Sequence, residues 1–354
     1  MRSLRTNKTL RTNVITYAVV VAAFVLFQAL GSAGVLSSTM KGQLVPICAY
    51  VLMALSLNLT VGILGELSLG HAGFMSVGAF AGAVTASAMQ DSVPSSALRL
   101  TVAVLVGAAL AAIVGVLIGI PVLRLNGDYL AIVTLAFGEI IKSIVNNLYI
   151  GMDVNGLHAS FLNNTIVLGE GGRMILSGPM GVPGIKKTAT FAAGFILILI
   201  ALFVIFNLVN SRAGRAIMAL RDNRIAAESV GINVTKYKLM AFVISAAIAG
   251  AGGALYGQAQ NAIIATKFDF NTSILILVFV VLGGMGNMLG SILAAALLTV
   301  LPELLRSLND YRMLIYAIVL ILMMLFNSAP AMVQWREQMT EKLRKTFGKE
   351  KKEG

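Results

Sequence analysis

The stretch ATFAAGFILILIALFVIFNLVN, residues 189–210, decides the fold class because it contains no charged side chain. An α-helix rises 1.5 Å per residue, so about 20 apolar residues cross the hydrocarbon core of a bilayer. Nine further apolar runs have nearly this length, at 14–30, 44–63, 67–89, 100–123, 129–150, 239–261, 272–288, 289–306 and 313–330. We therefore predict an all-α integral membrane protein, a polytopic bundle of about eight to ten transmembrane helices.

The composition excludes an ordinary soluble domain. Of the 354 residues, 58% are hydrophobic and 12% are charged, and the mean hydropathy is +0.87, whereas typical globular proteins contain about 25% charged residues. The net charge of +12 does not indicate a nucleic-acid partner, because the positive residues lie in three blocks beside apolar runs and not along a basic groove. The lipid bilayer is the expected environment.

The three basic blocks predict the topology. The first comprises Arg2, Arg5, Lys8 and Arg11, the second Arg212, Arg215, Arg221, Arg224, Lys236 and Lys238, and the third Arg336, Lys342, Arg344, Lys345, Lys349, Lys351 and Lys352. Short basic flanks of membrane spans stay in the cytosol. Ten crossings that start from a cytosolic N-terminus place all three blocks on that side, in agreement with this rule.

These boundaries give a basic N-terminus at 1–13, a transmembrane domain at 14–330 and a basic cytosolic tail at 331–354. Within the domain, the polar, Gly-rich segment 151–188 is expected to be an extracytoplasmic loop, and 211–238 a cytosolic loop. The first block and Val14–Leu30 also fit a signal peptide, with a cleavage site at Gly31–Gly34. The many later spans make an uncleaved first helix the simpler interpretation.

Two glycine-rich segments suggest breaks in the helices and an internal repeat. LGHAGFM at 69–75 and LGGMGNM at 282–288 share Leu, Gly, Gly and Met at matching offsets. Broken helices at corresponding positions of two halves often form the substrate site of a transporter. Gly-rich helices in membranes are also simply close-packing faces, and both interpretations stay open. Pro302 predicts a further interruption at 289–306.

Polar residues inside apolar runs are costly and so are candidates for a translocation pathway. This argument selects Asn58, Glu66, Ser68, His71 and Glu139, although each could instead satisfy a neighbouring helix. No Walker A motif, Gly-x-Ser-x-Gly elbow or metal-ligand spacing accompanies them, since His71 and His158 are the two histidines. We therefore expect neither an enzyme nor a cofactor bound by this chain.

The cytosolic segment 211–238 predicts a short amphipathic helix. Ser211 is a suitable N-cap, the apolar residues Ile217, Leu220, Ala227 and Val230 recur at helical spacing, and Gly231 is a suitable C-cap. One helix over 213–230 could lie on anionic lipid. Alternatively it inserts into a groove on a cytosolic protein, with small Ala226 and Ala227 permitting close approach.

This loop carries a resemblance to a known family. IAAESVG at 225–231 resembles the EAA loop of ABC importer permeases, with Ile225 where the general motif has Glu. NGDYLAIVTLAFGEI at 126–140, LSLGHA at 67–72 and LGGMG at 282–286 are similar to the M-type permease of branched-chain amino acid importers. The resemblance runs from about residue 44 to 330, and it implies a type II-like ABC importer permease.

The resemblance implies a subunit in a bacterial cytoplasmic membrane that forms half of a pathway for leucine, isoleucine or valine. Expected partners are a second, H-type permease, two cytosolic ATPases that use ATP and Mg, and an extracytoplasmic amino-acid-binding protein. The candidate ATPase-coupling residues are Arg221, Asp222, Ile225, Ala226, Ala227, Glu228 and Gly231. The candidate pathway residues are Asn58, Ser68, Gly70, His71, Glu139, Gly283, Gly284 and Gly286.

Two alternatives remain. The first is a permease for urea, short amides or another small solute, since specificity in such systems depends largely on the binding protein. The second is an ion-coupled secondary transporter or membrane enzyme, for which we would expect paired intramembrane acids or a catalytic cluster.

Overall fold

The computed structural model describes residues 2–34, 37–90, 92–125, 127–153, 156–163, 165–166, 168–169, 172–305 and 311–328. The predicted tail at 331–354, with the third basic block, lies outside these residues, as do Asn126 and Glu170. The chain forms two compact units, Met1–Leu297 and Leu298–Gly354. The second unit holds the end of α11 (Met288–Leu304) and α12 (Arg312–Ser328).

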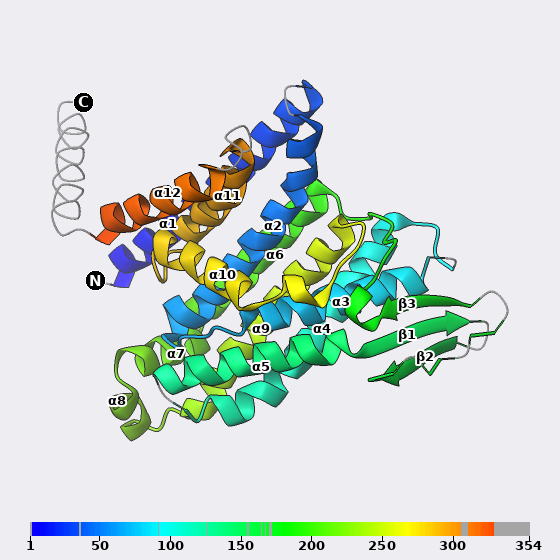
Figure 1. Ribbon diagram of the computed structural model, residues 1–354. Helices are drawn as coiled ribbons and strands as arrows, with labels where there is room; N and C mark the ends of the chain where they lie inside the picture. Colours follow the sequence, from blue (N-terminus) through cyan, green and yellow to red (C-terminus); the bar gives the residue numbers. More distant parts are fainter. Residues whose placement is uncertain are drawn as a thin grey trace. The chain divides into compact units, whose positions relative to one another are not determined.

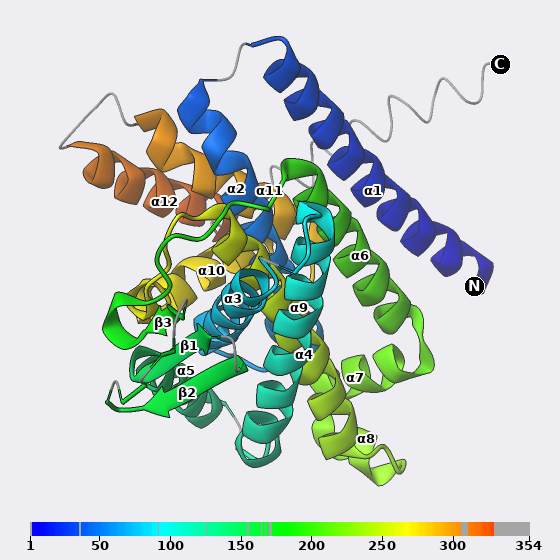
Figure 2. The same cartoon turned by 90° about the vertical axis from the view of Figure 1, so that its right-hand side faces the viewer.

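Helices dominate the first unit (Figures 1 and 2). They are α1 (Arg2–Ser32), α2 (Ser38–Asn58), the π-helix η1 (Leu59–Leu64), α3 (His71–Ala88), α4 (Ser96–Val122), α5 (Asp128–Asn146), α6 (Phe191–Asn210), α7 (Arg212–Asp222), α8 (Arg224–Ser229), α9 (Val234–Ala259), α10 (Phe270–Gly283) and most of α11. Each of the ten predicted apolar runs overlaps one of these helices or α12, although the runs at 67–89, 129–150 and 272–288 extend beyond their helices. The predicted helical, polytopic fold class is therefore confirmed.

Six helices in the described part of the chain are long and apolar enough to cross a membrane. They span Asn13–Ser32, Ser38–Leu64, Ser96–Val122, Phe191–Asn210, Val234–Ala259 and Ala265–Gly283, and Met288–Leu304 is a shorter apolar helix. The count of eight to ten crossings stays a prediction. The break expected at Pro302 was wrong, because α11 continues through this residue to Leu304.

The core of the first unit is built around α9, which packs on α2, α3 and α4. Small residues let these backbones approach closely. A Cβ atom on Gly78 of α3 would lie 2.0 Å from the carbonyl oxygen of Gly250 in α9, and one on Gly253 would lie 2.0 Å from that of Met75. The glycines of α9 are therefore packing positions.

The segment 151–188, which is expected to be an extracytoplasmic loop, contains a small sheet that the sequence analysis did not predict. Strands β1 (Leu148–Asp153), β2 (Gly156–Phe161) and β3 (Arg173–Ser177) form an antiparallel sheet in the order β2-β1-β3. Residue exposure alternates along β2, as expected for a strand with one covered face. Figure 1 shows this sheet and the α7–α8 pair at opposite ends of the helices, which agrees with the two loops facing opposite sides of a membrane.

Candidate functional site

The 211–238 segment forms two helices, and the single helix predicted over 213–230 was wrong. Ser211 is the N-cap of α7, since its Oγ accepts the N–H of Gly214 at 3.1 Å. Asn223 adopts extended dihedrals (φ −156°, ψ 102°), and its Oδ1 accepts the N–H of Ala226 at 3.0 Å. The asparagine thus ends α7 and caps α8, which makes a corner in the loop.

The corner divides the coupling candidates between the interior and the surface. Ile217, Leu220 and Ala227 are buried, so Ala227 packs inside this chain, on the apolar face where it was predicted. Ile225 and Val230 are 81% and 76% exposed. Val230 was wrongly placed on the apolar face, because the turn at Asn223 rotates α8 away from the face that α7 buries.

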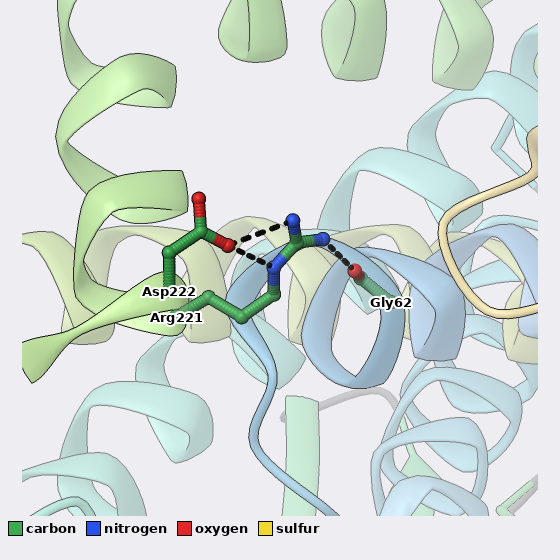
Figure 3. Close-up of polar contacts among 3 residues, drawn as sticks. All are labelled: Gly62, Arg221 and Asp222. Carbon is green, nitrogen blue, oxygen red and sulfur yellow. Dashed lines mark hydrogen bonds and ion pairs between the residues drawn. The ribbon is translucent and has the colours of Figure 1, made fainter.

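Arg221 connects this loop to the membrane core (Figure 3). Its Nη1 donates to the carbonyl oxygen of Gly62 at 2.9 Å, while Nε and Nη2 donate to Oδ1 of Asp222 at 3.2 and 3.0 Å. Gly65, at φ +81°, makes room for the arginine, since a Cβ atom there would lie 2.5 Å from Cγ of Arg221. Arg221 therefore lies over the C-terminal end of η1.

Asn58, the last residue before η1, brings two groups of predicted pathway residues together. Its side chain is fully buried. Oδ1 accepts the N–H of Gly286 at 2.7 Å, and Nδ2 donates to Oγ of Ser291 at 2.8 Å. Gly284 (φ +89°) and Gly286 (φ +82°) form the turn between α10 and α11. We call this arrangement the Asn58 clasp.

His71 and Ser68 belong to a second buried cluster, which is centred on Ser245 of α9. His71 Nε2 lies 2.8 Å from Ser245 Oγ, and its Nδ1 lies 3.1 Å from Ser68 Oγ. Thr60 Oγ1 donates to Ser245 Oγ at 2.8 Å, and Ser56 Oγ donates to the Ser245 carbonyl at 2.7 Å. All these side chains are at most 1% exposed. The cluster joins α2, η1, α3 and α9.

Comparison with known proteins decides the family. The model of the family described as "Branched-chain amino acid transport system / permease component" matches residues 39–325. The chain belongs to this family. It is 38% identical to the high-affinity branched-chain amino acid transport system permease protein LivM of Salmonella typhimurium, over 82% of this chain and 69% of the relative. The Escherichia coli LivM is 37% identical over the same shares.

The more distant relatives include permeases of other solutes. The nucleoside ABC transporter permease protein NupC of Lactococcus lactis is 25% identical over 55% of this chain and 59% of its own. No solved structure matches the chain. The resemblance seen in the sequence is thus confirmed: the chain is a multi-pass membrane permease and a transport subunit.

The remaining pathway candidates of the permease occupy different surroundings. Gly70 is a packing position, because a Cβ atom there would lie 2.3 Å from the Thr134 carbonyl oxygen. Gly283 likewise packs on Gly290. Glu139 is separate from both polar clusters and forms an ion pair with Lys142 on α5, where their side chains are 43% and 26% exposed. The structure thus brings Asn58 to Gly286 and Ser68 to His71, but it does not join Glu139 to them.

Sequence reasoning missed several residues and did not predict the burial of one. Ser56, Thr60, Ser245 and Ser291 complete the two clusters, and the only sequence signal was a hydroxyl within an apolar run. Lys238 was assigned to the cytosolic basic block, yet it is 3% exposed and forms an ion pair with Glu66. Among the described residues, no group of three or more His, Cys, Asp or Glu side chains is placed to hold a metal.

Proposed function

We propose that this permease is the membrane subunit of an ATP-driven importer of leucine, isoleucine and valine, and that it forms half of the translocation pathway. The observation that carries the proposal is the family match over residues 39–325, together with 37–38% identity to two LivM proteins. Its partners would be a second permease of the H type, two cytosolic ATPases that consume ATP with Mg, and an extracytoplasmic amino-acid-binding protein.

In this proposal the α7–α8 corner contacts an ATPase, and both chain termini lie in the cytosol. The exposed Ile225 and Val230 give the corner an apolar tip that fits a groove on the partner. ATP binding would favour one of two arrangements of the permease, and the difference in binding free energy between these arrangements would drive alternating access. The permease itself carries out no bond chemistry.

Uptake by the reconstituted transporter tests the function. Proteoliposomes that contain all partners should accumulate labelled leucine, isoleucine and valine with ATP, and accumulate none with a non-hydrolysable analogue. Uptake driven by a proton gradient without ATPase subunits would contradict the proposal. A panel with urea, a nucleoside and fructose tests the substrate, because a nucleoside permease and a fructose permease are also among the more distant relatives. Faster uptake of one of these solutes than of leucine, isoleucine and valine would identify that solute as the substrate in place of the amino acids.

A further inference from the structure

We infer that Arg221 is the positioning residue through which the α7–α8 corner controls the Asn58 clasp, by means of the π-helix η1. This inference rests on the proposed role of the corner as the ATPase contact, and it adds the route by which a movement there reaches the membrane core. Its three steps run from Arg221 to Gly62, from Gly62 to Asn58, and from Asn58 to Gly286.

The first step is the hydrogen bond between Arg221 and the Gly62 carbonyl. The last carbonyl groups of a helix lack a partner within the helix, and a cation there also interacts favourably with the helix dipole. Helix α7 contacts η1 directly, and the Arg221 side chain of α7 donates to the backbone of η1. Because Gly65 has no side chain, the stem of Arg221 lies against the backbone. A displacement of α7 therefore acts on the end of η1.

The second step is the π-helix itself. A π-turn holds one residue more than an α-turn, and it is uncommon except as a short bulge, frequently at functional sites. Its conversion to α-helix would shift the register by one residue, which corresponds to about 100° of rotation and 1.5 Å of rise. Asn58 directly precedes η1. A register change in η1 would therefore redirect the Asn58 side chain.

The third step is the clasp. Asn58 uses both its oxygen and its nitrogen to hold the start of α11 and the turn before it. The backbones are in close contact here, because a Cβ atom on Gly62 would lie 2.2 Å from the Gly286 nitrogen. A cavity of about 190 Å³ borders the same place, and its lining includes Ile63, Gly286 and Met288. The turn thus has both a tight hold and a space into which it can move.

The test compares R221M with R221K in the reconstituted transporter. Methionine keeps most of the aliphatic stem and loses the donors, whereas lysine keeps the charge and a single donor nitrogen. R212M is the matched control, because Arg212 is an exposed arginine of the same helix. We expect R221M to lower leucine uptake about tenfold, the factor that corresponds to one charge-assisted hydrogen bond, while ATPase activity changes less than about twofold. R221K should be intermediate, and R212M should match the wild type.

Hydrogen exchange provides a readout that a merely local role of Arg221 would not change. The Gly286 N–H is bonded to Asn58 and does not contact Arg221. Exchange across 284–290 should therefore rise about tenfold in R221M and in N58A, and the double variant should exchange no faster than N58A alone. If R221M does not assemble, a smaller rise in R221K supports the inference, and no rise overturns it.

Further results also overturn the inference: unchanged exchange across 284–290 in R221M, additive exchange in the double variant, or a parallel fall of uptake and ATPase activity. Failure of the proposed function is distinguishable, because the wild-type transporter would then show no ATP-driven uptake. A wild type that transports leucine beside an R221M variant with the same uptake refutes only the route through Arg221.

Discussion

Lys238 of α9 and Glu66, which follows η1, form an ion pair with side chains only 4% and 14% exposed. The pair joins the first turns of α9, just after the α7–α8 corner, to the non-helical segment between η1 and α3. Two charges removed from water are costly unless each satisfies the other. The pair therefore holds the start of α9 against the segment that follows η1.

Removal of one partner should harm the permease more than removal of both. K238M would leave the Glu66 carboxylate buried without its partner and should lower the free energy of unfolding by about 3 kcal/mol. The double variant E66Q/K238M leaves no unpaired charge and should recover most of this loss. Thermal unfolding of the purified permease measures the stability of the single and the double variant. A double variant that is less stable than K238M would show that the two residues act independently.

The crossing of α3 and α9 should not tolerate a single added methyl group. Gly78→Ala would place a Cβ atom 2.0 Å from the backbone oxygen of Gly250, so the helices would have to separate. We expect a loss of about 1–3 kcal/mol, the usual cost of overpacking. Gly42→Ala is the matched control, because a Cβ atom there meets nothing within 4 Å. Equal melting temperatures for the two variants would contradict the described contact.

The Ser245 cluster predicts a smaller effect from a smaller deletion. Ser245→Ala would remove the hydroxyl that receives the Thr60 bond and contacts His71. A buried group left without its partner costs about 1–3 kcal/mol. Thr101→Ala, at an exposed position of α4 where the hydroxyl bonds only to its own helix, should change the melting temperature little. Similar losses in both variants would show that the cluster contributes no specific stability.

The fold was predictable because hydrophobic length is a local signal. Each apolar run specifies a helix whatever the rest of the chain does, as the run at 189–210 and helix α6 illustrate. The corner at Asn223 was missed although its cap is also local, since the helical spacing of apolar residues continues across it. The short strands were missed because glycines and turn residues dominate their surroundings.

The contacts of the site could be predicted only in part, because they join distant residues. Asn58 was selected because a buried polar side chain is costly, and this argument identified one of the residues that form the clasp. Its partner Ser291 lies 233 residues away, and nothing near either residue indicates the other. Lys238 appeared as one more cytosolic cation for the same reason. Pairing across the chain depends on how the helices pack, and one sequence contains no direct record of that.

The turn at Gly231 offers the sharpest test of the α7–α8 corner. Gly231 has φ +85°, and a Cβ atom there would meet nothing within 4 Å, so the backbone conformation alone requires glycine. A β-branched residue in the left-handed region costs at least about 1–2 kcal/mol, whereas asparagine visits this region more readily. We expect Gly231→Ile to abolish leucine uptake and stimulation of the ATPases while insertion into the membrane persists. Gly231→Asn should keep a large part of both activities. Full transport by the isoleucine variant would show that the turn after α8 does not matter for coupling. Equal loss of activity in both variants would show that any side chain at this position disturbs the contact with the partner, and that the backbone conformation is not the reason for glycine.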